Sequence, residues 1–130
     1  MNDTANHDKD SLHRFDFEHL PIRGQLIHLD ASWQALLEHR EYPQMIRDVL
    51  GEAVAASALL AATIKFDGLL TMQLKGDGPM PLLLAQCTSG LNVRGLARYR
   101  EHDDRLSSDN IRQLAGAGNL TVTLESEDLK

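Results

Sequence analysis

The stretch KFDGLLTMQLKGDGPMPLLL, residues 65–84, decides the fold. Apolar and polar residues alternate over 69–75, which predicts a strand with one buried face. The run PLLLAQC at 81–87 predicts a second strand, and the Gly-Asp-Gly at 76–78 is typical of the turn between two antiparallel strands. A phosphate-binding loop would lead from a strand into a helix, whereas this one leads into prolines and another strand. We therefore interpret the stretch as a helix end, a strand, a hairpin turn and a second strand.

Two helices are predicted before this hairpin. Asp30 suits the N-cap of a short helix over 31–39. Pro43 suits the first turn of a second helix that extends to Lys65, with Gly68 ending it in the left-handed conformation. The apolar stripe predicted for this second helix consists of Ile46, Val49, Leu50, Ala53, Leu60, Ala61 and Ile64. From residue 53 onward the helix is apolar on nearly every side, which predicts burial on most of its circumference.

Further strands are predicted on both sides of this central region. Residues 15–29 are strand-like, with Gly24 marking either a bulge or a close approach of the backbone. Residues 91–100 predict a third strand of the hairpin region, and 119–125 a last one. Ser108 can cap a short helix between them. The predicted fold class is α+β, a mixed or antiparallel sheet packed on a long buried helix.

Length and charge bound the function. A chain of 130 residues fits one domain, which we predict to comprise a disordered tail at 1–13 and a core at 14–130. The net charge of -6 argues against nucleic acid and against an anionic membrane surface as partners. The N-terminus has no apolar signal segment, and the apolar run at 53–64 is too short to span a membrane. The lone Cys87 allows no disulfide within the chain, which favours the cytoplasm.

The sequence shows no catalytic signature. The 6 histidines have no strong metal-ligand spacing, so a metal site would depend on tertiary proximity alone. Cys87 lies late in an apolar strand, where a buried inert thiol is commoner than a nucleophile paired with a histidine. Arg94, Arg98 and Arg100 precede acidic residues, which favours a solvated or ion-paired face over a nucleic-acid contact. We predict that the chain is not an enzyme, with a Cys87-dependent enzyme as the remaining catalytic alternative.

Several motifs in order resemble one known family. They are IRGQLIHL at 22–29, the run from EYPQ to LAQC at 41–87, and VRGLARY at 93–99. This series is similar to the N-terminal part of the 33 kDa heat-shock chaperone family of bacteria, over about 15–125. The resemblance implies a cytoplasmic, dimeric, ATP-independent holdase, regulated by redox state, that binds unfolding client proteins under oxidative and heat stress.

The resemblance does not extend to the family's switch. In that family four cysteines of a C-terminal domain bind zinc when reduced. None of them is present here, so zinc is expected for full-length members, and no cofactor or metal site is expected in this chain. An interrupted sheet would leave an edge strand unpaired, which favours a homodimer, with strand exchange as one way to form it.

The client surface predicted from the sequence consists of apolar sheet residues: Leu70, Met72, Leu74 and Leu96. Methionine adapts to many partners, and exposed apolar surface is what a holdase needs. The competing interpretation is that the helix over 43–65 covers these residues as core. The chain would then be a passive dimerisation scaffold that binds no client on its own.

Overall fold

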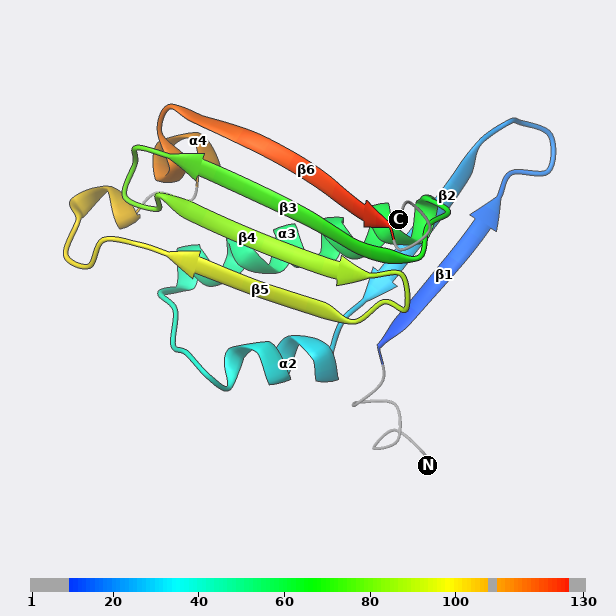
Figure 1. The fold of residues 1–130 in the computed structure, drawn as a ribbon, viewed down its shortest axis with the longest axis horizontal. Helices are drawn as coiled ribbons and strands as arrows, with labels where there is room; N and C mark the ends of the chain where they lie inside the picture. The colour runs from blue at the N-terminus through cyan, green and yellow to red at the C-terminus, as the bar shows by residue number, and fades with distance from the viewer. Residues whose placement is uncertain (1–9, 108–109, 127–130) are drawn as a thin grey trace.

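A four-stranded antiparallel sheet packed on one long helix forms the centre of the protein (Figure 1). The computed structural model describes residues 10–107 and 110–126. In chain order the elements are β1 (Ser11–Asp16), β2 (Arg23–His28), α2 (Ala31–Leu37), α3 (Gln44–Thr63), β3 (Gly68–Gly76), β4 (Leu82–Thr88), β5 (Val93–Arg98), the 3₁₀ turn η1 (Asp104–Ser107), α4 (Ile111–Ala115) and β6 (Gly118–Ser126). The strand order in the sheet is β5-β4-β3-β6, and β1 and β2 form a separate hairpin. The predicted α+β class is confirmed, in its antiparallel form.

The helix α3 covers one face of this sheet, as predicted for the long apolar helix. Its buried residues are Ile46, Val49, Leu50, Val54, Ser57, Ala58 and Ala61. Leu60 and Ile64, which the sequence placed in the buried stripe, are 38% and 39% exposed, so that part of the prediction is wrong. The buried side rotates around the helix along its length because the helix packs on a twisted sheet. Ile64 lies beyond the last helical residue.

The end of α3 also differs from the prediction. The helix ends at Thr63, and Ile64 is already extended, with φ -94° and ψ 137°. Gly68 does not terminate the helix; it is the first residue of β3. A Cβ on Gly68 would lie 1.9 Å from the carbonyl oxygen of Glu125 on the neighbouring strand β6. The glycine therefore serves the close pairing of two strands.

The N-terminal part forms a hairpin where the sequence indicated one strand-like run. Because β1 begins at Ser11, regular structure starts within the segment predicted as a tail; residues 1–9 lie outside the described part. At Gly24 the close-approach alternative is confirmed, because the ring of Phe15 occupies the space that a side chain would need. The hairpin packs on α3 through β2.

The caps of the two short helices are only partly as predicted. α2 ends at Leu37, and Asp30 occupies its N-cap without a side-chain capping bond. Instead, the carboxylate of Asp10 accepts a hydrogen bond from the backbone N–H of Asp30 at 2.7 Å. α4 is capped by Asn110, whose side chain accepts from the backbone N–H of Arg112. The predicted cap, Ser108, lies outside the described residues.

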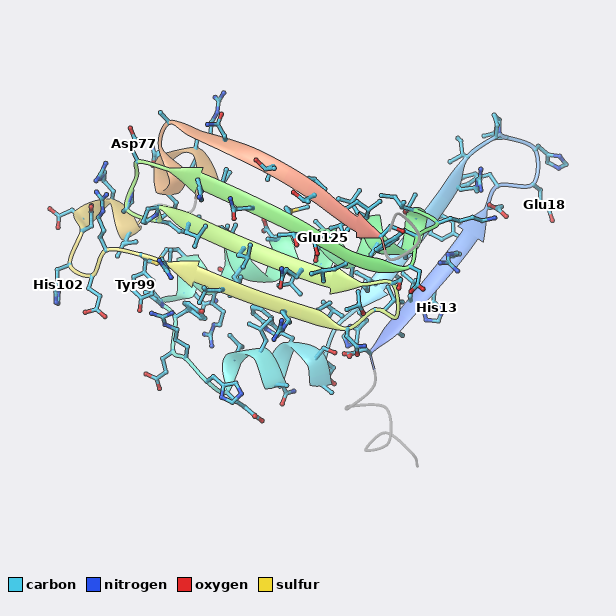
Figure 2. All side chains as sticks on the ribbon, in the orientation of Figure 1. His13, Glu18, Asp77, Tyr99, His102 and Glu125 are labelled. Carbon is cyan, nitrogen blue, oxygen red and sulfur yellow. The ribbon has the colours of Figure 1, made fainter. Side chains whose placement is uncertain are left out.

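The Gly-Asp-Gly segment is a hairpin connection, as predicted, and it also fastens the hairpin to the chain around 114–118. The backbone N–H of Gly78 donates to the carbonyl of Ala115 at 2.8 Å. The carboxylate of Asp77 accepts from the backbone N–H of Ala117 at 2.8 Å. Figure 2 shows Asp77 at the end of the sheet where α4 lies. We call this set of contacts between 76–80 and 114–118 the clasp.

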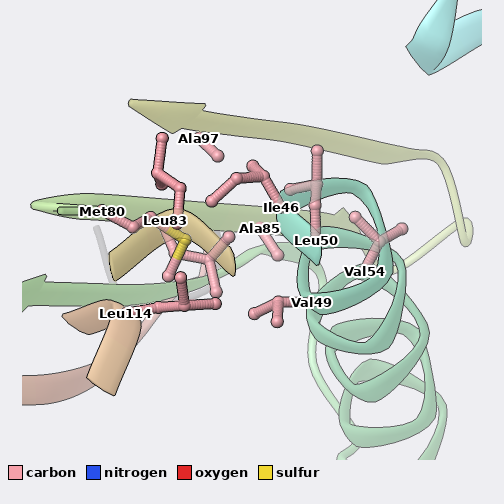
Figure 3. Close-up of a cluster of buried hydrophobic side chains, with 10 residues drawn as sticks. Ile46, Val49, Leu50, Val54, Met80, Leu83, Ala85, Ala97 and Leu114 are labelled. Carbon is pink, nitrogen blue, oxygen red and sulfur yellow. The ribbon is translucent and has the colours of Figure 1, made fainter. Parts of the chain in front are cut away.

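The main core lies between α3 and the inner side of the sheet (Figure 3). Its fully covered side chains come from α3, the β3–β4 hairpin, β5 and α4. They include Ile46, Leu50, Val54, Met80, Leu83, Ala85, Ala97 and Leu114. A second, smaller cluster joins the C-terminal half of α3 to Leu70 and Cys87.

Candidate functional site

The strand β6 carries a row of exposed apolar side chains on the helix side of the sheet. Its register pairs Leu120 with Leu74, Val122 with Met72 and Leu124 with Leu70, so all six side chains share one face. α3 packs mainly over β4 and β5, which lie two and three strands away from β6. Leu120, Val122 and Leu124 are consequently 62%, 49% and 40% exposed. We call these three residues the β6 row.

A groove of about 470 Å³ lies beside the β6 row, between α3, β3 and α4. Val49 and Ala53 of α3 form one wall, and Leu120 stands on the other. Ile111 of α4, which is 44% exposed, lines one end. Glu52 and Arg112 are the charged residues of its lining. The lining of the groove is therefore mainly apolar, with two charged side chains. Such a lining suits an apolar segment that carries occasional polar groups.

The four client-binding residues predicted from the sequence do not lie together. Met72 and Leu74 are half-buried and line the groove next to the β6 row. Leu70 is fully buried against Ala58 and Ala61 of α3. Leu96 lies on β5 and lines a different hollow beside α2. The structure therefore gathers two of the four around one surface.

The β6 row was missed from the sequence, although a signal was present. NLTVTLE alternates apolar and polar residues and was interpreted only as a strand. Alternation shows that three side chains share a face, but not whether another element covers that face. The missing fact was the position of α3 relative to the last strand.

A second exposed apolar area lies on the β1–β2 hairpin. Its members are each roughly half exposed or more: Phe15, Phe17, Leu20, Ile22 and Leu26. The ring centroids of Phe15 and Phe17 lie 6.3 Å apart, so the two rings are in aromatic contact.

The chemistry of the described residues gives no support to a reactive centre. Cys87 is fully buried, and burial raises the pKa of its thiol, which disfavours the nucleophilic thiolate. Within the described residues no three His, Cys, Asp or Glu side chains could hold a metal ion. His13 and His102 lie at opposite ends of the molecule (Figure 2). With one buried thiol, the described residues do not supply the four cysteine or histidine ligands of a structural zinc site.

One ion pair on the described surface joins two residues that are close in sequence, Asp103 and Arg105. Arg105 binds both carboxylate oxygens of Asp103, at 3.1 Å and 2.9 Å, and these bonds lower the pKa of Asp103. Arg94 and Arg98 are exposed on β5. Among the helices of the described part, none is long and apolar enough to cross a membrane.

Comparison with known proteins decides the family. The model of the family described as Hsp33 protein matches residues 10–130. The chain belongs to the Hsp33 family. Proteins named 33 kDa chaperonin are 44% identical to it in Methylobacillus flagellatus over 120 residues and in Nitrosococcus oceani over 119 residues. In each case the match covers 92% of this chain.

A third relative has a similar sequence identity and coverage. The 33 kDa chaperonin of Pseudomonas putida strain F1 is 44% identical over 91% of this chain. The chain spans about 40% of the length of these relatives. Hsp33 is a redox-regulated family of chaperones and not of enzymes, and the resemblance predicted from the motifs is confirmed.

Proposed function

We propose that this Hsp33 chain is the dimerising, client-binding core of an ATP-independent holdase that acts in the cytoplasm under oxidative and heat stress. The observation that carries the proposal is the β6 row beside an apolar groove in a chain of a chaperone family. Unfolding proteins expose apolar side chains, and an accessible apolar surface captures them without any nucleotide. Zinc and the redox switch belong to parts of longer family members that this chain does not match.

The client surface would combine the β6 row with the predicted residues that adjoin it. Met72 and Leu74 extend the row into the groove, and methionine adapts to different client side chains. Leu70 is covered by α3 and would contribute only if the helix moved. Leu96 would form part of a separate contact near α2.

Light scattering of a heat-denatured client protein tests the proposal. The chain is added in excess, with and without a reducing agent. Suppression of scattering in both conditions is expected, because no redox switch lies within the described residues. Absence of suppression in both would contradict client binding and favour the passive dimerisation scaffold.

A pair of variants locates the surface. Leu120→Ser removes a side chain that is 62% exposed in the β6 row, and Leu26→Ser removes one that is 63% exposed on the hairpin. The first is expected to weaken suppression and the second to leave it unchanged. Equal loss in both variants would show that general surface hydrophobicity, and not the groove, binds the client.

A further inference from the structure

We propose that the edge of β5 and the groove beside it bind an extended acidic segment of another polypeptide, which pairs with β5 as an added strand. The inference goes beyond the holdase proposal, because it concerns a different surface and a different kind of contact. Within the described residues β5 pairs only with β4 and forms the edge of the sheet opposite β6. An edge strand presents backbone donors and acceptors with which a further strand can pair.

The hydrogen-bond pattern shows which residues of β5 present these groups. The backbone N–H of Thr88 donates to the carbonyl of Asn92 at 2.9 Å, so these two residues form a bonded pair where the two strands meet. Bonded pairs recur at every second residue of an antiparallel ladder, so the even-numbered residues of β5 bond to β4. The N–H and C=O groups of the odd-numbered residues, Val93, Gly95 and Ala97, therefore point away from the sheet.

A contact at Ala97 agrees with this direction. Its backbone N–H donates to the hydroxyl oxygen of Tyr42, in the segment that follows α2, at 3.4 Å. Within the described part of the chain, no hydrogen bond joins the outward N–H groups of Val93 and Gly95 to another residue. The open part of the edge is thus the stretch around Gly95, and Tyr42 closes one end of it.

Gly95 keeps this stretch of the edge accessible to another backbone. A side chain is excluded there, because its Cβ would lie 2.9 Å from Cγ2 of Val54 and 3.2 Å from Cδ1 of Leu36. A glycine inside a strand often marks a place where another backbone approaches closely. Figure 1 shows α2 alongside β5 at this edge, so one side of an added strand would contact α2.

A groove of about 460 Å³ lies between β5 and α2, and we call it the β5 groove. Ala35 and Leu36 of α2 supply apolar lining. The charged side chains of the lining are the cations Arg40 and Arg94, which are exposed together with the titratable His39. Among the described residues none of these three forms an ion pair. In a chain of net charge -6 the β5 groove is therefore a local basic site, ready to bind carboxylates.

The two kinds of lining specify the occupant. Side chains of an added strand alternate between two faces. Those on one face would contact Ala35 and Leu36, which suits apolar residues, and those on the other would lie beside Arg94, which suits aspartate or glutamate. A second copy of the chain fits poorly, because two β5 strands paired antiparallel around Leu96 would place Arg94 of each copy opposite Arg98 of the other. The occupant is an extended segment in which acidic and apolar residues alternate.

Fluorescence anisotropy with labelled peptides tests the inference. The probe is a short peptide in which glutamate and valine alternate, and its counterpart has lysine in place of glutamate. The wild-type chain is expected to bind the first and not the second. Arg94→Glu should weaken binding of the glutamate peptide by roughly tenfold or more. Arg23→Glu is the matched control, because it makes the same change of charge at an exposed site on the β1–β2 hairpin and should leave binding unchanged.

Methylated peptides separate strand pairing from attraction between charges. One version carries methyl groups on the backbone nitrogens of valine and the other on those of glutamate, and both keep the charge of the probe. The valine version should bind roughly tenfold more weakly if the added strand is antiparallel to β5, and the glutamate version if it is parallel. Equal binding of all three peptides, or tighter binding of inorganic polyphosphate than of the probe, would show a general anion site and would overturn strand pairing.

Hydrogen exchange, followed by nuclear magnetic resonance, reads the edge directly. In the free chain the outward amide of Gly95 should exchange fast, and that of Leu96, which bonds to β4, should exchange slowly. A saturating amount of the glutamate peptide should slow exchange at Gly95 by about tenfold or more and leave Leu96 unchanged. Circular dichroism checks that Arg94→Glu and Arg23→Glu keep the fold. Unaltered exchange at Gly95 with the peptide bound, or equal peptide affinity of the two variants, would overturn the inference.

Discussion

Replacing Gly78 with alanine perturbs the clasp at a point of close backbone contact. A Cβ there would lie 2.4 Å from the carbonyl oxygen of Leu114 and 2.7 Å from the carbonyl carbon of Ala115. Both atoms belong to the backbone and cannot rotate away as the end of a side chain would. The hairpin loop and the turn before β6 must therefore separate.

The cost follows from the contacts that hold the two segments together. Gly78 and Met80 donate backbone hydrogen bonds of 2.8 Å to Ala115 and Leu114. Losing both costs about 1–3 kcal/mol. The side chains of Met80 and Leu114 are fully buried beside them, and partial loss of their packing costs about 2 kcal/mol more. Alanine restricts the unfolded chain more than glycine does, which offsets the loss by about 0.5–1 kcal/mol. The free energy of unfolding is expected to fall by about 2–4 kcal/mol.

Urea unfolding followed by circular dichroism measures this loss. With a slope of about 2 kcal/mol/M, the midpoint should fall by about 1–2 M. Gly90→Ala is the control, because the nearest atoms to its Cβ lie 3.7 Å and 3.8 Å away. Its urea midpoint should change little, because its free energy of unfolding should change by under about 0.5 kcal/mol. Equal midpoints for the two variants would refute the argument that the Gly-Asp-Gly segment is required by close backbone packing.

Two further predictions concern titrating groups. The thiol of Cys87 should react with a thiol reagent only after denaturation, and fast modification of the native chain would contradict its burial. Burial raises the pKa of this thiol above about 9.0, the value in the unfolded chain. The stability that the neutral thiol contributes is therefore complete below pH 9.0 and is lost as the pH rises further. Cys87→Ala should consequently reduce the fall in urea midpoint above that pH. Burial opposes ionisation of Asp10, but hydrogen bonds from the hydroxyl of Ser32 and from backbone N–H groups outweigh it and lower the pKa of Asp10 below 3.8. Asp10→Asn should therefore cost under about 1 kcal/mol at neutral pH, and the difference in urea midpoint from the wild type should shrink as the pH falls through 4; a constant difference would contradict this.

Local sequence patterns predicted the elements better than their ends. Alternation over 69–75 and the Gly-Asp-Gly turn identified β3 and β4, because a strand with one covered face has a period of two. Gly68 was misassigned because glycine suits both a helix end and a tight strand contact. Only the position of Glu125, far along the chain, decides between the two.

The candidate surface was harder to predict for a related reason. Leu70 and Leu120 look alike in the sequence, because each is an apolar residue in an alternating strand. In the structure Leu70 is 0% exposed and Leu120 is 62% exposed. The difference depends on where α3 crosses the sheet, which no local pattern encodes.

One apolar sheet face is thus partly covered by α3 and partly exposed. Burial is complete for alternate residues of β4, such as Ala85 and Cys87, and partial at Met72 on β3. It is smallest on β6, at the edge of the sheet.

The position of a substitution relative to α3 therefore predicts whether it affects stability or client binding. A substitution under α3, such as Leu70→Ala, should lower stability by about 2–5 kcal/mol and reduce client binding only as far as the chain unfolds. A substitution in the β6 row should reduce client binding while the urea midpoint stays nearly constant, because an exposed side chain contributes little to folding. A β6-row variant that loses binding and stability together would place that row in the core and remove the basis for a client surface there.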